Sequence, residues 1–530
     1  MTFLTKARRY YHTLRYLKPV QLFYQVRYRL SPVSSLKRIE FEGKTSEQFA
    51  LLAPPREKEV IQVSGSEISV TVLNQTITFQ KKINWAEERH GKLWNYQLQY
   101  ADFLKQNSLP LSTKENLISD LYKWLESGKL SPEPYPASLR VMNVVRFLAT
   151  NNELERKDEL LDFLYSELHF LEKRLEYHLL GNHLLENGFA LLMGGAFMNN
   201  QRWTKTARHI FSEEVPEQIL SDGGHFERSP MYHLILLYRF LEALYYLPSD
   251  DDLHPLFLET SKKMLGWIDQ MSFQNGDLAH FNDSTDGQSC SKNEIFQIAR
   301  ECGITDYPTT TLGESGFRRF EAGGVELLVD VSGIEPIYQP AHAHADSLSF
   351  ILYYQGKPII TDPGVSTYET GERRNWERST KAHNTVTFRD QNTAGMWDKF
   401  RVASRPGVEI LKESDFGLDI SLKYTLKSGE LFKQTRNIEF TTGFVEITDF
   451  VNLEQAVDGR LHFHPNIRIQ ELTKNKVILN CGITIKFLDV HQIQQFTYKC
   501  STGFNRRSDS IGICYTFKKN TSLRIILQST

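Results

Sequence analysis

The hydrophobic pattern of the chain changes its period near Thr309. Before that point, apolar residues recur at helical spacing, for example over residues 161–177, 184–198 and 231–247. So many consecutive helices without intervening strands indicate a helical array or toroid rather than an α/β fold. The sequence therefore predicts a helical domain over residues 85–308.

After Thr309 the chain consists of short β-rich runs separated by turn residues, such as GVELLVDVSG, HNTVTFRD and GRLHFHPNIRIQEL. These runs predict an antiparallel β-sandwich over residues 309–530. A small β element is also expected at 58–82, within an N-terminal segment (1–84) that begins with a basic helical stretch. The predicted fold class is multidomain α+β.

The overall charge is nearly balanced, with 62 basic and 64 acidic residues, so the sequence carries no signature of nucleic-acid binding. The first thirty residues are nevertheless basic and aromatic, and they contain neither the continuous apolar stretch of a signal peptide nor a membrane span. A basic amphipathic helix of this kind can lie on an anionic membrane surface or pack on its own domain. Both interpretations stay open.

Two histidines are candidates for metal binding or proton transfer. In HAHADSLSF, the alternation predicts a strand with His342 and His344 on one face and Ala343 and Ala345 on the other. Such imidazoles can share a metal, or divide into a metal ligand and a proton-transfer group. A pair of hydrogen-bonded surface histidines is the alternative. The five cysteines have no CxxC spacing, so a metal would be held by histidines and carboxylates.

A tyrosine is expected at the start of a helix. Ser229 is a typical N-cap and Pro230 suits the first helical position, which places Tyr232 in the first turn. The positive end of the helix dipole would stabilise a tyrosinate there and lower the pKa of the phenol. An ordinary core or surface tyrosine is the alternative.

A second helix start lies in GNHLLENG, where Asn182 and His183 precede Glu186 on the face that His183 occupies. Together these side chains could bind a carboxylate or sugar hydroxyls, although capping alone would also explain Asn182. The polar loop NDSTDG (282–287) could line a cleft or could simply form turns.

Six stretches, taken in order, resemble the heparinase II/III family of polysaccharide lyases, which is related to some alginate lyases. They are GNHLLENG (181–188), SDGGHFERSPMYH (221–233), NDSTDG (282–287), PAHAHADSLSF (340–350), TDPGVSTY (361–368) and AHNTVTF (382–388). The N-terminal third resembles the branch of this family found beside bacterial surface-polysaccharide genes. The resemblance implies an incomplete α/α toroid followed by an antiparallel β-sandwich, with the substrate cleft between them.

The resemblance also implies the reaction and the residues that perform it, namely cleavage of a uronic-acid polysaccharide, such as a glycosaminoglycan, by β-elimination. Tyr232 and His342 match the proton-transfer residues, and Asn182 and His183 match the pair that binds the uronate carboxylate. The residues expected to contact substrate are Glu186, Asn187, Glu227, Arg228, Asp283 and Arg378. The residues expected to hold a structural zinc ion are His344, Asp362 and His383.

Two other functions are compatible with the sequence. A glycoside hydrolase on a similar toroid would need two placed carboxylates, and no pair stands out. A non-catalytic protein of capsule or exopolysaccharide assembly would only bind the polymer. The resemblance implies the cell envelope or periplasm, whereas the lack of a visible signal peptide favours the cytoplasm or the inner membrane. The expected partner is an acidic polysaccharide.

Overall fold

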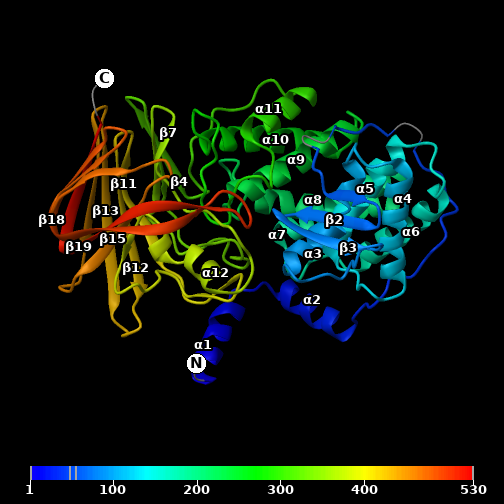
Figure 1. The fold of residues 1–530 in the computed structure, drawn as a ribbon, viewed down its shortest axis with the longest axis horizontal. Coiled ribbons are helices and arrows are strands. Elements are labelled where there is room, and N and C mark those ends of the chain that lie inside the picture. The colour runs from blue at the N-terminus through cyan, green and yellow to red at the C-terminus, as the bar shows by residue number, and fades with distance from the viewer. Residues whose placement is uncertain (1–2, 47–48, 54–56, 528–530) are drawn as a thin grey trace.

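The computed structural model describes residues 3–46, 49–53 and 57–527, which form a helical half and a β half (Figure 1). The helical half contains α3 (Lys92–Gln99), η1 (Asp102–Lys105), α4 (Leu111–Glu126), α5 (Pro134–Thr150), α6 (Lys157–Lys173), α7 (Gly181–Phe197), α8 (Gln201–Gln218), α9 (Pro230–Tyr246), α10 (Leu253–Gln270) and α11 (Lys292–Glu301). Neighbouring helices pack in pairs, such as α7 with α8 and α9 with α10.

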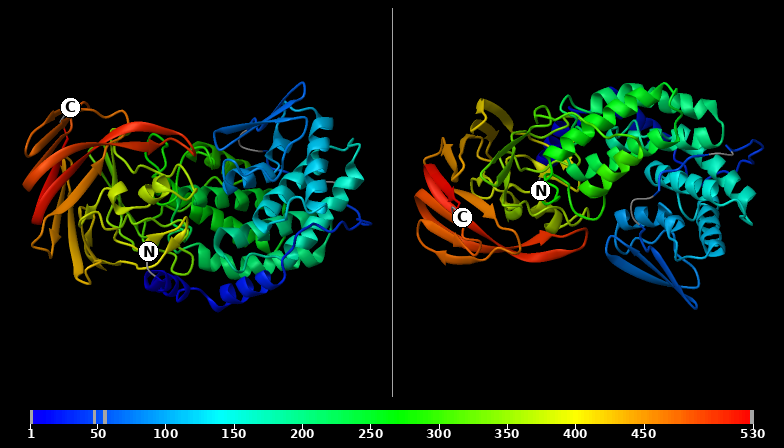
Figure 2. Two further views of the ribbon diagram at one scale, coloured as in Figure 1. Left: turned by 60° about the horizontal axis from the view of Figure 1, so that its bottom comes forward. Right: turned by 90° about the horizontal axis from the view of Figure 1, so that it is seen from above.

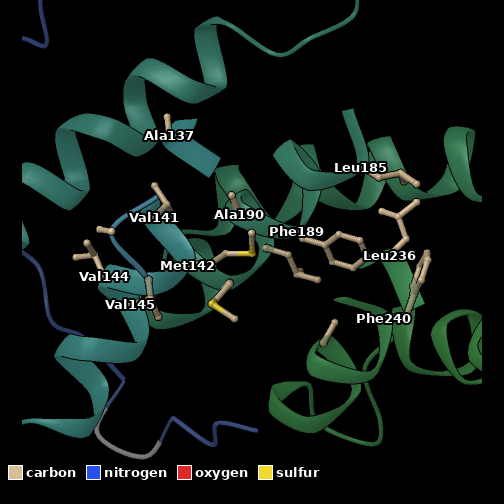
Figure 3. Close-up of a cluster of buried hydrophobic side chains, with 14 of the residues drawn as sticks. Ala137, Val141, Met142, Val144, Val145, Leu185, Phe189, Ala190, Leu236 and Phe240 are labelled. Atoms are coloured by element: carbon tan, nitrogen blue, oxygen red, sulfur yellow. The ribbon is translucent and has the colours of Figure 1, made fainter. Parts of the chain in front are cut away.

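The core of the helical half is formed by the apolar faces that the helical spacing predicted. Phe189 of α7 packs edge to face on Phe240 of α9, with ring centroids 5.0 Å apart (Figure 3). Val141 of α5 and Leu236 of α9 are fully buried in the same cluster. Burial of these faces joins α5, α7 and α9, which also line the cleft described below.

The β half contains two antiparallel sheets with a shared apolar core. It also contains a short two-stranded sheet of β9 (Met396–Trp397) and β10 (Arg401–Val402), and the short helices α12 (Glu372–Glu377) and η2 (Thr380–Ala382). The smaller of the two sheets with the shared core has the order β4 (Phe317–Ala322), β5 (Val325–Asp330), β6 (Phe350–Tyr354) and β7 (Lys357–Ile360). The larger sheet contains β8 (Val386–Thr387), β11 (Gly407–Ser414), β12 (Gly417–Thr425), β13 (Leu431–Phe440), β14 (Phe444–Val451), β15 (Val457–His462), β16 (Ile469–Leu472), β17 (Lys476–Leu479), β18 (Thr484–Ser501) and β19 (Arg507–Ile526). Burial alternates along β13, as expected where one face of a sheet meets the core. The predicted α+β fold class is confirmed.

The N-terminal segment contributes elements to both halves. A three-stranded antiparallel sheet, β1 (Ile61–Ser64), β2 (Glu67–Val72) and β3 (Gln75–Gln80), lies within the predicted range 58–82. Helix α1 (Phe3–Leu14) lies against the β half, and α2 (Pro19–Leu30) runs along the helical half (Figures 1 and 2). Among the residues that the structure describes, no helix combines the length and apolar character needed to cross a membrane.

The predicted strand through His342 and His344 is wrong, because residues 341–349 form an irregular loop before β6. The loop's backbone bonds distant segments instead of a neighbouring strand: Ala345 N–H donates to the carbonyl of Arg378. Ala343 and Ala345 are buried in a small apolar cluster, while both histidines bond Asp283. The separation of polar and apolar sides therefore exists without a strand.

The strands β18 and β19 form a long hairpin whose tip reaches the helical half. The side-chain amide of Asn74, in the turn between β2 and β3, donates to the carbonyl of Phe504, at 2.8 Å. Asn505 returns a hydrogen bond of 3.1 Å to the carbonyl of Leu73. The hairpin tip thus bridges the two halves beside the cleft.

Candidate active site

A cleft of about 550 Å³ lies between the two halves. The helical half contributes His183 and Tyr232, and the β half contributes His342, Tyr368 and Phe504. The cleft therefore brings residues from distant parts of the chain to one surface.

Tyr232 occupies the first turn of α9, as predicted. The hydroxyl oxygen of Ser229 accepts a hydrogen bond from the Tyr232 N–H, and Pro230 starts the helix. The Tyr232 ring stacks on the His342 ring with centroids 3.9 Å apart, and its hydroxyl lies 3.3 Å from that of Tyr368.

The expectation of a lowered Tyr232 pKa is wrong. Burial raises the pKa of Tyr232 well above its ordinary value, and the neighbouring Tyr368 and Asp283 add to the increase. Loss of water around a phenolate outweighs the helix dipole, which falls off within a turn. Tyr232 is therefore a neutral phenol, suited to donating a proton.

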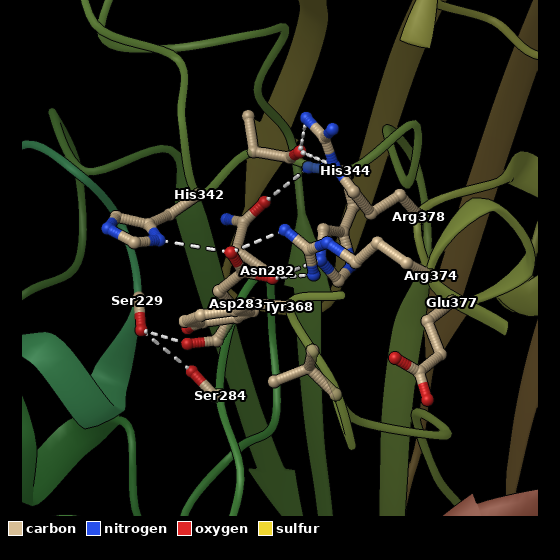
Figure 4. A network of polar contacts seen from close by, with 12 residues as sticks. Ser229, Asn282, Asp283, Ser284, His342, His344, Tyr368, Arg374, Glu377 and Arg378 are labelled. Carbon is tan, nitrogen blue, oxygen red and sulfur yellow. Dashed lines mark hydrogen bonds and ion pairs between the residues drawn. The ribbon is translucent and has the colours of Figure 1, made fainter. Parts of the chain in front are cut away.

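Asp283 holds the β-side histidines in place (Figure 4). One oxygen lies 3.0 Å from His342 Nδ1, the other lies 2.9 Å from His344 Nε2, and both accept from Arg374. Although burial favours the neutral acid, the Arg374 guanidinium and the histidine hydrogen bonds hold the pKa of Asp283 well below its usual range. Asp283 was predicted to contact substrate, but it is fully buried behind the cleft wall.

Glu227 connects the two walls from behind. Its carboxylate accepts from the Asn182 backbone N–H at 2.9 Å and from the Asn182 amide at 2.8 Å. Its Oε2 atom, which accepts from the Asn182 amide, also lies 3.3 Å from His342 Nε2. Glu227 itself does not line the cleft, so its predicted substrate contact is replaced by a positioning role.

His183 is the cation that the cleft offers from α7. Its Nδ1 lies 3.0 Å from Glu176, and its ring packs on Tyr135 with centroids 4.3 Å apart. Burial opposes the charge, but the Glu176 carboxylate outweighs it and raises the pKa of His183 above the ordinary value. Glu176 thus favours a protonated imidazole beside Asn182.

Glu186 and Asn187 lie behind the wall rather than on it. Glu186 is fully buried and accepts from Arg239 Nε at 3.0 Å, and Asn187 donates to Glu176 at 3.0 Å. The i, i+3 spacing correctly placed Glu186 and His183 at neighbouring positions of α7. However, His183 lines the cleft and Glu186 does not. Their predicted substrate contacts are wrong for this arrangement.

Arg228 and Arg378 also point away from the cleft. Arg228 donates to the carbonyl of Glu314 at 3.2 Å. Arg378 is buried and donates to the carbonyls of Ala343 and Lys399, which pins the loop that carries His342. Neither arginine lines the cleft, so neither is placed to bind a uronate.

The lysines and arginines that line the cleft lie beside carboxylates of the protein itself, which offset their positive charges. Among the described residues, each has a carboxylate beside it. The pairs are Lys92 with Glu133, Lys58 and Lys105 with Asp102, Arg146 with Glu242, Arg239 with Glu186 and Glu242, and Lys399 with Glu369. The surface between these pairs is rich in tyrosine and phenylalanine.

A group of metal-ligand type lies next to the site. His344, Asp346 and His383 each offer a ligand atom, and these three atoms lie within 4.8 Å of one another. His344 Nδ1, Asp346 Oδ2 and His383 Nε2 have no hydrogen-bond partner among the described residues, which fits a bound cation. Asp362, predicted as a ligand, instead lies 2.6 Å from the other nitrogen of His383.

Two family models match the chain in succession. Residues 80–302 match the heparinase II/III N-terminus, and residues 305–527 match the heparinase II/III-like C-terminal domain. The chain belongs to the heparinase II/III family.

The matched relatives of this family are longer than the aligned region. The chain is 25% identical to a heparin-sulfate lyase of Bacteroides stercoris over 434 residues, which cover 68% of this chain and 64% of that protein. It is 26% identical to a heparin-sulfate lyase of Pedobacter heparinus over 345 residues, covering 58% and 49%. The alignments thus span about half to two-thirds of these relatives.

Solved structures share the fold. A heparinase III structure superposes with a TM-score of 0.63 at 19% identity, covering 85% of this chain and 80% of that one. A Streptomyces coelicolor A3 chondroitin AC lyase in complex with chondroitin sulphate has a TM-score of 0.51 at 9% identity, covering 82% and 74%. The helical half followed by antiparallel sheets is therefore a shared architecture.

Three residues of the candidate site were missed in the sequence analysis. Asp346 continues the two-residue spacing of His342 and His344, and Tyr368 ends the TDPGVSTY stretch. Both residues could therefore have been predicted from the sequence. Glu176 carries no local signal, since only the fold brings it to His183.

Proposed function

We propose that the protein is a polysaccharide lyase that cleaves a uronic-acid-containing polysaccharide by β-elimination. The observation that carries the proposal is the stacking of Tyr232 on His342 in the wall of one cleft. The two rings come from opposite halves of the molecule, and their centroids lie 3.9 Å apart. Asn182 and His183 line the same cleft. The names of the matched relatives, heparin-sulfate lyases, support this reaction class.

The first requirement of the reaction is to neutralise the uronate carboxylate, because removal of the C5 proton builds further negative charge beside it. His183 has a raised pKa and supplies a positive charge, and Asn182 supplies an amide next to it. Both groups stabilise the enolate-like transition state by hydrogen bonding and charge.

The second requirement is a base and an acid on the reacting bond. With Nδ1 of His342 hydrogen-bonded to Asp283, Nε2 is the nitrogen that takes the C5 proton, and the Glu227 carboxylate, 3.3 Å from Nε2, stabilises the imidazolium that forms. The C5–H electron pair becomes the C4=C5 double bond, and the C4–O4 bond breaks. The neutral phenol of Tyr232 donates its proton to the departing oxygen.

The charge of the cleft favours a polymer with carboxylates and few sulfates. A densely sulfated chain needs several available cations, whereas the lysines and arginines that line this cleft already have carboxylate neighbours. We therefore propose an acidic, weakly sulfated or unsulfated glycosaminoglycan-like substrate.

The test follows the conjugated double bond that a lyase leaves. Purified protein is incubated with uronate polysaccharides that differ in sulfation, and ultraviolet absorbance is followed. We expect unsulfated chains to be cleaved fastest, and Tyr232→Phe to lower kcat by about 10³-fold or more. Tyr245→Phe, an exposed residue of the same helix, should leave kcat unchanged. New reducing ends without absorbance would indicate a hydrolase, and no products from any polymer would favour a binding protein.

We also propose that His344, His383 and Asp346 hold a divalent cation of the zinc class. Its role is structural: it would tie the loop that carries His342 to the sheet, while Asp362 orients His383 from behind. Metal content measured after purification should fall strongly in Asp346→Asn and less in Asp362→Asn. The reverse order would restore Asp362 as the ligand that the sequence predicts.

A further inference from the structure

Helix α2 packs on the protein with its polar side. Gln21 is buried and donates to the carbonyl of Leu179 at 3.2 Å, and the Tyr28 hydroxyl donates to that of Leu175 at 2.7 Å. Tyr24, on the same side, stacks on a tyrosine of the helical half. This arrangement reverses the usual order, in which the apolar face of a surface helix meets the core.

The apolar side of α2 faces away from the protein. Leu22, Phe23, Val26 and Leu30 are between 41% and 80% exposed. At about 100° per residue, these four positions share an arc of roughly 100° on the helix surface. A continuous exposed apolar stripe of this kind indicates a surface that is covered in use.

Helix α1 repeats the pattern twelve residues earlier. Tyr10, Tyr11 and Leu14 are all exposed, with the spacing that Leu22, Phe23 and Val26 show in α2. Each set is followed directly by an arginine, Arg15 or Arg27. The two helices lie on the same side of the molecule (Figures 1 and 2). We group the exposed apolar residues of these two helices as one surface, the N-terminal face.

All charged side chains of residues 1–39 are positive. No aspartate or glutamate precedes Glu40, whereas lysines and arginines stand at 6, 8, 9, 15, 18, 27, 29, 37 and 38. Arg27 and Arg29 are exposed, border the stripe of α2 on either side, and make no ion pair with any described residue. Positive side chains beside an apolar stripe match a surface that is apolar below and anionic at its boundary.

We propose that the N-terminal face docks on an anionic lipid surface. Each helix has 12 residues and is about 18 Å long, too short to cross a bilayer core of about 30 Å, so both would lie in the interface. The tyrosines of α1 suit that depth. A second copy of the chain is disfavoured as the partner, because a symmetric contact would bring the same cations together. The inference is independent of the proposed lyase activity.

The test measures co-sedimentation of the full-length protein with vesicles. We expect binding to vesicles that contain phosphatidylglycerol, weakening with salt, and little binding to pure phosphatidylcholine. Arg27→Glu with Arg29→Glu should lower the partition coefficient about thirty-fold or more. Phe23→Ser with Leu30→Ser should lower it about ten-fold or more.

Matched controls separate this surface from general stickiness. Leu411→Ser with Phe416→Ser removes exposed apolar side chains of the β half, and Lys518→Glu with Lys519→Glu reverses exposed charges there. Both should leave vesicle binding unchanged. All four double variants should retain the wild-type circular dichroism and the wild-type turnover of a soluble substrate, so loss of lyase activity and loss of docking are distinguishable.

Two results would overturn the proposal. The first is that the wild-type protein does not bind anionic vesicles, or binds neutral vesicles equally well. The other is a wild-type protein that self-associates in gel filtration through these residues, with the α2 variants monomeric, since the face would then be a protein–protein interface.

Discussion

On the helical wall of the cleft, Asn182 and Tyr232 occupy the first turns of α7 and α9, whereas His342 on the β wall sits in a loop without regular neighbours. The position of Tyr232 follows from a local cap, Ser229, three residues away. The position of His342 depends on Asp283, 59 residues earlier in the chain.

The difference lies in how many groups depend on one contact. A helix start is stabilised by many backbone hydrogen bonds, so loss of one cap costs about 1 kcal/mol. The β wall concentrates two histidines and a buried arginine on a single carboxylate, Asp283. Loss of that charge leaves Arg374 buried without its partner. We therefore expect the two walls to respond very differently to single substitutions.

The largest expected effect is that of Asp283→Asn. Removal of one member of a buried ion pair should lower the free energy of unfolding by about 3–5 kcal/mol and also impair turnover. Urea denaturation and kcat measure the two effects. Asp286→Asn, which alters an exposed carboxylate of the same loop, should cost less than about 1 kcal/mol. Equal losses in the two variants would contradict the special dependence on Asp283.

A smaller effect is expected for Ser229→Ala on the helical wall. Loss of the N-cap of α9 should lower the free energy of unfolding by about 1 kcal/mol. Ser291→Ala removes the equivalent cap of α11, outside the cleft, and should cost a similar amount. Only Ser229→Ala should also reduce kcat, because Ser229 additionally donates to the carbonyl of Asp283 at 2.7 Å. An unchanged kcat would show that the two walls are not coupled through this serine.

The smallest effect concerns the pH dependence of substrate affinity. Glu176 raises the pKa of His183, so the imidazolium persists above its ordinary pKa and is lost only as pH rises through the raised value. In Glu176→Gln the KM should begin to rise at lower pH, reaching about three-fold over wild type in mildly alkaline buffer. KM profiles from pH 6 to 9 provide the measurement. Glu172→Gln, which alters an ion pair with the exposed Arg202, should leave the profile unchanged.

Local signals predicted the helical wall well. The Ser229–Pro230 pair specified where α9 begins, and hence the place of Tyr232. The same signals gave the wrong direction for the pKa of Tyr232. An N-cap motif predicts that the residue lies near the positive end of a helix dipole, but it does not predict the burial that raises the pKa. Spacing along α7 also placed Glu186 near His183 without showing that Glu186 faces the interior.

For the β wall, the sequence predicted which residues lie together but not the backbone structure that carries them. The histidines at 342 and 344 do lie together, although the loop that carries them is not a strand. What joins them is Asp283, and no spacing in the sequence reveals a contact between segments 59 residues apart. The same reason explains Arg378, whose charge suggested a substrate contact but whose role is to hold backbone carbonyls.

The tip of the β18–β19 hairpin has a consequence for the evolution of this architecture. Asn74 and Asn505 exchange contacts across the two halves, while α1, from the opposite end of the chain, packs its Tyr10 on Trp397 of the β half. The first helix and the last hairpin of the chain thus each contact the half to which they do not belong. A recombination event that replaced one half alone would have to bring both sets of contacts with it, so we expect the halves to be inherited as a unit.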